Sequence, residues 1–313
     1  MLGKTAGGLY WMFRGLERAE NNARLIEAGF RIALTRSTNT ATEWKSVIVT
    51  SAAQQGFTAK HTEFNSTNVI DYLLRDTDNP SSVLSVVKQA RDNARMVRTA
   101  LTTEVWSAVN ETWMLITELL KNPVPDTDLP EVLSIIRQQS ALVRGALHGT
   151  MLRNDIYDFC RLGTFIERMD STARIIDVKY YTLLPSPSLV GSRMDNVQWE
   201  TLLRSVSAHR SYRWAVEDDY TATNIANFLV LDRRMPRSLA FCAGQIVENL
   251  DYLSEEYSDR RPSHDMVDRL AARLKGRDIH SIIEEGLHDV LGTIISDVGA
   301  LGAQIEKDYR FNY

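Results

Sequence analysis

Acidic and basic side chains recur together in a pattern that suits the binding of a carboxylate or phosphate group. The pattern Glu-Arg-x-acid-x-x-Ala-Arg-x-Ile-acid occurs at residues 17–27 and again at 167–177. Its candidate site residues are Glu17, Arg18, Glu20 and Arg24 in the first copy, and Glu167, Arg168, Asp170 and Arg174 in the second. Arginine presents a planar fork of N–H donors that fits an internal carboxylate, or an external carboxylate or phosphate, in bidentate fashion.

The spacing of this motif indicates a helix with one charged stripe. At about 100° per residue, Glu17, Glu20, Arg24 and Glu27 fall on the same side. An acid four residues before an arginine is the favourable order for a helical ion pair. Three interpretations remain open: an interior network, a pocket for a ligand or for catalysis, and a solvated face worth only ~0.5 kcal/mol per pair. We expect the charged residues of the two copies to lie near one another.

Other residues that could bind an ion are fewer. We regard His209, Arg210 and Arg237 as secondary candidates for binding an anion. One Glu-x-x-His pair, Glu285 and His288, is present, but a di-metal site in a helical bundle needs two such pairs and further inward glutamates. The chain also lacks the glycine-rich phosphate loops of nucleotide-binding proteins. We therefore predict no metal and no cofactor.

The elements that must hold these side chains are predicted to be helices nearly throughout. Residues 81–121 contain no proline and no glycine, which predicts one long helix or a helix with one bend. Proline-rich segments at 123–130 and 184–193 read as connectors. Strand-length alternation with turn residues does not recur, so the predicted fold class is all-α.

The sequence also repeats itself over longer distances. The two motif copies align at an offset of 150 residues, a Trp-centred segment at 44–57 aligns with 199–212, and 68–83 aligns with 224–239. Three matches in the same order predict a duplication, with halves at 1–150 and 151–313 forming one compact unit. We expect a bundle of about ten or more helices, in which the halves are related by a pseudo-two-fold axis.

Composition limits the function classes. The chain has 313 residues, of which 44% are apolar, and a net charge of −4, which disfavours a nucleic-acid partner. Its two cysteines, Cys160 and Cys242, form no disulfide or zinc pattern, so we expect a reducing compartment. The first twenty residues become charged too early for a signal peptide, and no apolar run is long enough to span a membrane. The predicted location is the cytoplasm.

The sequence resembles the alpha-E family of bacterial all-helical proteins, which is named for a conserved Glu-Arg motif. The resemblance covers essentially the whole chain. It rests on Leu-Tyr-Trp at 9–11 before the first motif copy, and on His-Gly-Thr-Met-Leu-Arg-Asn-Asp at 148–155 before the second. One departure is visible: the family has an arginine after the glycine of Gly-Arg-x-x-Glu-Arg, whereas Thr164 follows Gly163 here. In the first copy, Arg14 keeps the arginine and Phe13 replaces the glycine.

The resemblance implies a functional setting rather than a reaction. Family members are associated with a circularly permuted ATP-grasp ligase and a transglutaminase-like cysteine protease, which implies a system that forms and trims peptide or amide bonds. The expected role is a non-catalytic partner or scaffold of that ligase and protease. The alternative is an enzyme or ligand-binding protein that uses a Glu/Arg-lined pocket between the two halves. The sequence contains no activated nucleophile or base in a recognisable setting, which favours the non-catalytic role.

Overall fold

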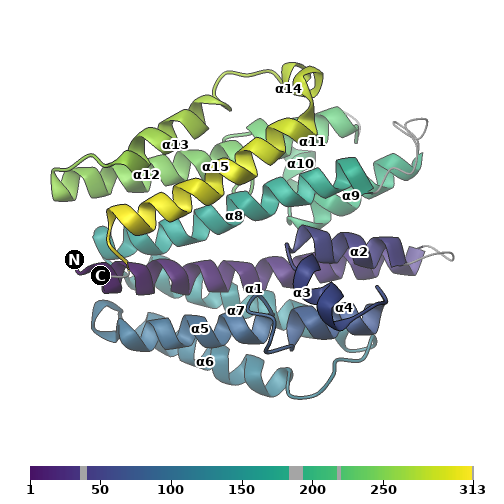
Figure 1. Cartoon of the computed structure of the whole chain (residues 1–313), viewed down its shortest axis with the longest axis horizontal. Helices are drawn as coiled ribbons and strands as arrows, with labels where there is room; N and C mark the ends of the chain where they lie inside the picture. Colours follow the sequence, from purple (N-terminus) through teal and green to yellow (C-terminus); the bar gives the residue numbers. More distant parts are fainter. Residues whose placement is uncertain (36–40, 183–192, 217–219, 312–313) are drawn as a thin grey trace.

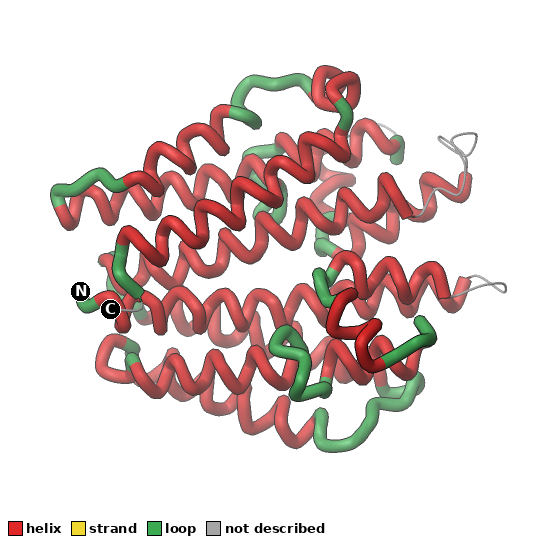
Figure 2. The backbone as a smooth tube through the Cα atoms, in the orientation of Figure 1, coloured by secondary structure: helices red, strands yellow, loops and turns green. Residues whose placement is uncertain are grey.

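The structure, a computed structural model, describes residues 1–35, 41–182, 193–216 and 220–311. Within these ranges the chain is all-α, as predicted, with fifteen α-helices, one 3-10 helix (η1) and no strand (Figures 1 and 2). The predicted connector at 184–193 falls outside the described residues up to 192. The elements are α1 (Gly3–Thr35), α2 (Ala41–Thr50), α3 (Gln54–Lys60), α4 (Ser66–Leu74), α5 (Val83–Met96), η1 (Arg98–Ala100), α6 (Thr103–Leu119), α7 (Leu129–Thr150), α8 (Asp155–Thr182), α9 (Arg193–Ser205), α10 (His209–Ala215), α11 (Ala222–Leu231), α12 (Leu239–Tyr257), α13 (Pro262–Ala272), α14 (Ile279–Glu285) and α15 (Leu287–Asp308).

Two long helices, α1 and α8, form the centre of the bundle and run side by side in the same direction (Figure 1). Helices α5 and α7 pack against α1, and α6 covers them, whereas α12 and α15 pack against α8 and are covered by α13. The two central helices approach very closely at Gly163. A Cβ atom built there would lie 2.2 Å from the carbonyl oxygen of Tyr10, so only glycine fits.

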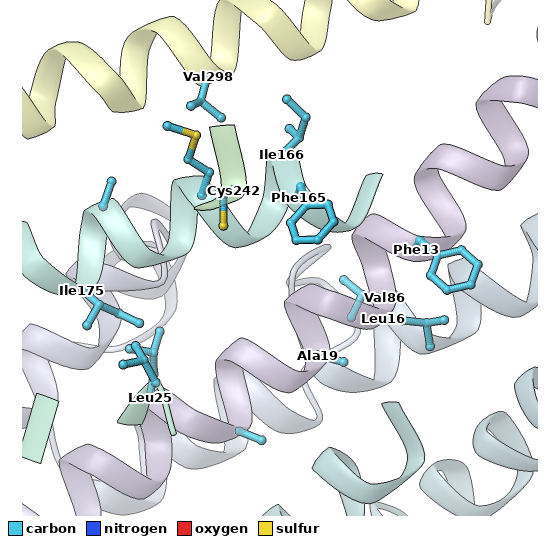
Figure 3. Close-up of a cluster of buried hydrophobic side chains, with 14 of the residues drawn as sticks. Phe13, Leu16, Ala19, Leu25, Val86, Phe165, Ile166, Ile175, Cys242 and Val298 are labelled. Atoms are coloured by element: carbon cyan, nitrogen blue, oxygen red, sulfur yellow. The ribbon is translucent and has the colours of Figure 1, made fainter. Parts of the chain in front are cut away.

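The core follows the apolar stripes of the central helices. Phe13 and Leu16 of α1 and Phe165 and Ile166 of α8 are almost fully buried, and they belong to one cluster that continues to Val298 of α15 (Figure 3). Burial of large apolar side chains at about 25 cal/mol per Å² is the main stabilising contribution in such a bundle. Part of the polar stripe of each central helix is enclosed as well, because helices surround α1 and α8 on most sides.

The prediction of one long helix, or of a helix with one bend, over residues 81–121 is wrong. The chain forms α5 and α6, which pack against each other, joined by η1 and a turn. The break has a local cause: Leu101 and Thr102 adopt extended backbone angles, and the Thr102 hydroxyl accepts the N–H of Val105 as an N-cap. A threonine cap interrupts a helix without proline or glycine, the two residues on which the prediction relied.

In the described part of the chain, no helix combines the length and apolar character that crossing a membrane requires.

Candidate functional site

The two Glu-Arg pairs bind each other reciprocally across the centre of the bundle. Arg168 of α8 grips Glu17 of α1, with Nε to Oε1 and Nη2 to Oε2 both at 2.9 Å. Arg18 of α1 grips Glu167 of α8 in the same way, with Nε to Oε1 at 2.6 Å and Nη2 to Oε2 at 2.9 Å. Each interaction is a bidentate, charge-assisted pair, the geometry for which a planar guanidinium is suited. The motif therefore joins α1 to α8.

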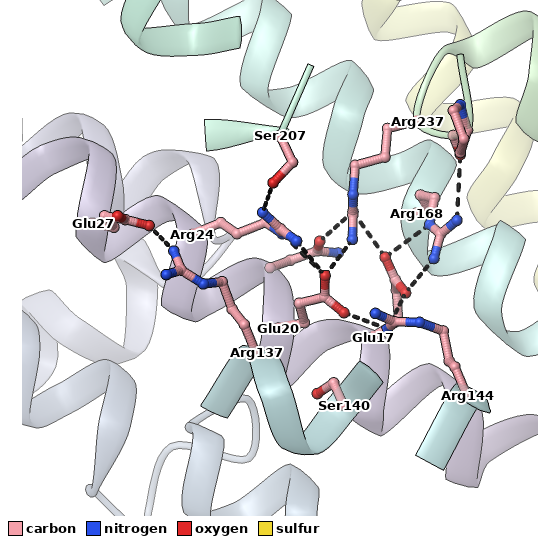
Figure 4. Close-up of polar contacts among 12 residues, drawn as sticks. Glu17, Glu20, Arg24, Glu27, Arg137, Ser140, Arg144, Arg168, Ser207 and Arg237 are labelled. Carbon is pink, nitrogen blue, oxygen red and sulfur yellow. Dashed lines mark hydrogen bonds and ion pairs between the residues drawn. The ribbon is translucent and has the colours of Figure 1, made fainter. Parts of the chain in front are cut away.

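Two further arginines extend the contacts on the α1 side (Figure 4). Arg237, which precedes α12, donates from Nη1 to Glu17 Oε1 at 2.9 Å and from Nη2 to Glu20 Oε1 at 2.7 Å. Arg144 of α7 donates to both glutamates, at 3.5 Å to Glu17. Arg24 also donates to Glu20 Oε1, from Nη2 at 2.6 Å. One face of α1 is thus linked to three other parts of the chain.

The α8 side is held by arginines of α1. Arg14 donates from Nε to Glu167 Oε2 at 3.0 Å, in addition to the bidentate contact of Arg18. The aligned position on α8 is Thr164, whose hydroxyl donates instead to the carbonyl oxygen of Cys160 at 3.0 Å. Thr164 therefore makes no contact corresponding to that of Arg14. We refer below to Glu17, Glu20, Glu167, Arg14, Arg18, Arg144, Arg168 and Arg237 as the Arg–Glu network.

The three carboxylates of the network are closed off from solvent. Glu17 and Glu20 are each 1% exposed, and Glu167 is 5% exposed. Burial alone would raise the pKa of Glu17, but the guanidinium groups of Arg168 and Arg237 outweigh it and hold the pKa far below the usual range. The pKa values of Glu20 and Glu167 are also lowered, because neighbouring arginines outweigh burial there too. All three carry a negative charge at neutral pH.

The permanent charge of these carboxylates makes them poor candidates for acid–base catalysis. A general acid or base needs a pKa near the working pH, and a permanently ionised carboxylate with its lone pairs occupied by arginine lacks that property. The two cysteines are buried, and burial raises the pKa of Cys242 to about 12 and that of Cys160 well above its ordinary value, so neither thiol is activated. The network is arranged for structural cohesion.

The remaining motif residues lie outside the network's enclosed part. Asp170 and Arg174 pair with each other, with Nε to Oδ2 at 2.8 Å, and their side chains are 23% and 30% exposed. Arg24 is less accessible, at 13%, and connects Glu20 to the hydroxyl of Ser207. Glu17 and Arg18 of the first copy therefore contact Arg168 and Glu167 of the second, whereas Asp170 and Arg174 form a separate, partly exposed pair.

A basic pocket of about 440 Å³ adjoins Arg24, between α1, α7, α9 and α10. Five arginines and one histidine line it, against a single carboxylate: Arg24, Arg31, Arg137, Arg204, Arg210 and His209, with Glu27. Glu27 pairs with both Arg31 and Arg137 (the latter in Figure 4). Glu200, behind the lining, binds Arg204 at 2.6 Å and His209 at 3.1 Å. We refer to these lining residues as the basic pocket.

The basic pocket keeps an excess of positive charge after these pairings. The Arg210 side chain is exposed and makes no hydrogen bond or ion pair within the described ranges. Arg24 has its pKa lowered to about 10, because burial and the nearby charge of Arg237 outweigh the attraction of Glu20. Burial and the charge of Arg237 both disfavour the charged form of Arg24, and an anion bound beside it would favour that form.

Of the secondary anion candidates, His209 and Arg210 line the basic pocket, whereas Arg237 is 7% exposed and belongs to the Arg–Glu network. Sequence reasoning missed Arg144 and Arg137 of α7 altogether. Their spacing of seven residues, which places both on one side of a helix, was the available signal.

Among the described residues, no group of three or more His, Cys, Asp or Glu side chains could hold a metal ion. The Glu-x-x-His pair is used elsewhere: Glu285 binds Arg277 at 2.6 Å, and His288 Nδ1 contacts Asp177 at 2.5 Å.

Comparison with known proteins agrees with the motif. Residues 1–309 match the model of Alpha-E, a predicted alpha-helical domain with a conserved ER motif. Uncharacterised proteins of Mycobacterium bovis and Mycobacterium tuberculosis are each 24% identical over 324 aligned residues, covering 95% of this chain. The chain spans about a third of their length, since the match covers 35% of each. No solved structure matches the chain. The match over nearly every residue places the chain in the Alpha-E family.

Proposed function

We propose that the protein is a non-catalytic binding component of a peptide- or amide-bond-forming system, and that its basic pocket holds the carboxylate-bearing part of a peptide. The observation that carries the proposal is the lining of the pocket, with five arginines and one carboxylate. Guanidinium groups from four helices around one pocket suit an anion with several oxygens, and bidentate contacts would orient that anion. The volume of about 440 Å³ suits a short side-chain or chain-end segment rather than a single small ion.

The partners belong to the same proposal. An ATP-grasp-type ligase activates a carboxylate, so a helical protein that holds a carboxylate-rich peptide would serve as its partner, with a transglutaminase-like protease trimming the product. In the mycobacterial relatives the matched segment is about a third of a longer chain, which is the arrangement expected of a domain that acts beside another. We further propose a cytoplasmic location, in keeping with the two free cysteines.

We also propose that residues 1–150 and 151–313 are duplicated halves related by an approximate two-fold axis. The reciprocal contacts of Glu17 with Arg168 and of Arg18 with Glu167 support it. The local turns support it as well. The left-handed residues Ala52 and Ser207 precede α3 and α10 at the sequence offset of 155, with φ of 57° and 54°. Serine hydroxyls cap the aligned helices α5 and α12.

Peptide binding tests the pocket. Isothermal titration calorimetry with pentaglutamate should show saturable binding that weakens as salt is added, because the contacts are charged and partly exposed. The double variant Arg31→Gln, Arg210→Gln should bind at least about tenfold more weakly, or about 1.4 kcal/mol. Arg95→Gln, at an exposed arginine of α5, is the matched control and should bind as the parent does. Inorganic phosphate in place of the peptide distinguishes a phosphate site. The pocket assignment fails if neither anion binds, or if the double variant binds both unchanged.

Co-purification tests the partner. The tagged protein, co-expressed with an ATP-grasp-type ligase and a transglutaminase-like protease from the same organism, should retain the ligase. The double variant should retain the ligase too while slowing ligation of an acidic peptide. Absence of any complex, with the ligase fully active alone, refutes the partner role.

A further inference from the structure

A second pocket, of opposite charge, lies at the N-terminal end of α8. It has a volume of about 700 Å³ and is formed by the first turns of α8 and the middle and end of α12. Five carboxylate residues line it: Asp155, Asp158, Glu248, Glu255 and Glu256. We call this the acidic pocket. It shares no lining residue with the basic pocket, and nothing in the proposed function depends on it.

The two arginines that also line the acidic pocket are committed to other partners. Arg153 donates to the carbonyl oxygens of Met151 and His148, both at 2.7 Å, and its guanidinium lies over the Tyr157 ring at 4.2 Å from the centroid. Arg161 donates to the side-chain oxygen of Gln245 and lies over Phe165. The carboxylates of the lining therefore outnumber the cations that could neutralise them.

Asp158 is the member of this lining that most needs a ligand. Its residue is only 5% exposed, yet nothing in the described chain donates a hydrogen bond to its carboxyl group or forms an ion pair with it. The side-chain oxygen of Asn154, one turn earlier, is also buried without a partner. Asp158 lines the pocket, so its carboxyl group is accessible there, and a donor that bound it would offset the cost of its burial.

The pKa of Asp158 responds to this environment. Burial raises it to about 7, and the negative charges of Asp155, Glu248 and Glu256 add to the rise, while Arg161 opposes it. Tyr309, beyond α15, and Cys160 are the other titratable groups that interact with Asp158, and both stay neutral near pH 7 because burial raises their own pKa values.

We propose that the acidic pocket binds an aliphatic primary amine in its ammonium form, with Asp158 as the anchoring carboxylate. An ammonium group brings three N–H donors to a carboxyl group that has none. A metal ion fits less well, because no group of three metal-binding side chains converges anywhere in the described ranges, and a single ion would leave most of the 700 Å³ unfilled. Tyr252, which is 52% exposed, adds an aromatic ring to the pocket lining, and such rings attract cations.

Calorimetry with 1,4-diaminobutane on the full chain tests the site, with Nα-acetyllysine amide as a second probe. Binding of either supports an ammonium site, and the tighter one tells whether the natural ligand is a free diamine or a lysine side chain. The amine stays protonated between pH 6 and pH 8, whereas Asp158 must lose its proton to bind it. Proton linkage then predicts an affinity that rises about tenfold from pH 6 to pH 8.

Asp158→Asn keeps the shape of the side chain and should abolish both the binding and its pH dependence. Asp126→Asn, at an exposed aspartate in the loop before α7, is the control and should leave both unchanged. Circular dichroism would verify that each variant is folded. The proposal is overturned if neither amine binds at millimolar concentration, if Asp158→Asn binds like the parent, or if magnesium chloride binds at this aspartate and the amines do not.

Discussion

Glu20 and Asp170 occupy the same place in the two copies of the motif but differ in burial. Replacing each by its amide therefore shows how much burial, rather than position in the motif, decides its contribution to stability. Glu20 is 1% exposed and accepts N–H donors from Arg24, Arg144 and Arg237. Asp170 is 23% exposed and pairs with one arginine. Glu20→Gln and Asp170→Asn both remove a charge while keeping the shape of the side chain.

The two variants are expected to lose severalfold different amounts of folding stability. Neutralising one partner of a buried ion pair costs about 3–5 kcal/mol, since the other charge stays buried and unpaired. Arg24 and Arg144 are 13% and 22% exposed, and Arg237 keeps its contact with Glu17, so the lower end, about 3 kcal/mol, applies to Glu20→Gln. A half-exposed pair is worth about 1 kcal/mol or less, which limits the loss in Asp170→Asn.

Urea unfolding at pH 7, followed by far-UV circular dichroism, measures both losses as changes in the free energy of unfolding. Thermal melts give a second measure of the same losses. At about 2 °C per kcal/mol for a chain of this size, the melting temperature should fall by about 6 °C in Glu20→Gln and by no more than about 2 °C in Asp170→Asn. Equal losses in the two variants, or a loss below about 1 kcal/mol in Glu20→Gln, would show that the network is hydrated and that the assigned burial is wrong.

Three further outcomes follow from the same structure. The lowered pKa values of the three buried glutamates mean that the unfolded chain takes up protons first, so the urea midpoint should fall steeply between pH 5 and pH 3; a flat midpoint would contradict the assignment. The raised pKa of Asp158 affects stability in the opposite direction, because ionising the folded carboxyl group costs stability as the pH rises from about 4 to 7. Asp158→Asn should therefore raise the melting temperature more at pH 8 than at pH 5. An equal gain at both pH values would refute this assignment. Gly163→Ala places a Cβ 2.2 Å from a carbonyl oxygen of α1 and should cost at least about 1–3 kcal/mol, whereas Gly145→Ala, which meets open space in α7, should stabilise by up to about 1 kcal/mol; thermal melts of both variants test the close approach of α1 and α8.

Local sequence rules predicted the parts of this structure that depend on local interactions. The helical class and the i, i+4 pairs of Glu20 with Arg24 and of Asp170 with Arg174 depend on residues within one helix, and each is present. The failure at residues 81–121 was local too, since a threonine N-cap at Thr102 ended the helix without the residues on which helix-breaking rules rely.

The partners of the network could not be predicted in this way, because they come together only in the tertiary structure. Arg237 reads as one of several basic residues before a helix, and only the packing of α12 on α8 brings it to Glu17. Arg144 was missed because its spacing from Arg137 places both on one side of α7 but does not indicate which helix that side faces. Helix periodicity orders residues around an axis, but the choice of facing helix fixes their burial and therefore their pKa values.

The two central helices supply unequal numbers of arginines to the network, because Thr164 stands on α8 where Arg14 stands on α1. Glu167 is held by two arginines of its neighbour helix, Arg14 and Arg18, whereas α8 supplies only Arg168 to Glu17. Arg237, from outside α8, supplies a further contact to Glu17 and also donates to Glu20. Its charge lowers the pKa of Arg24. Arg237 thus links the buried network to Arg24 at the edge of the basic pocket, through their shared contact with Glu20 and through the charge that lowers the pKa of Arg24.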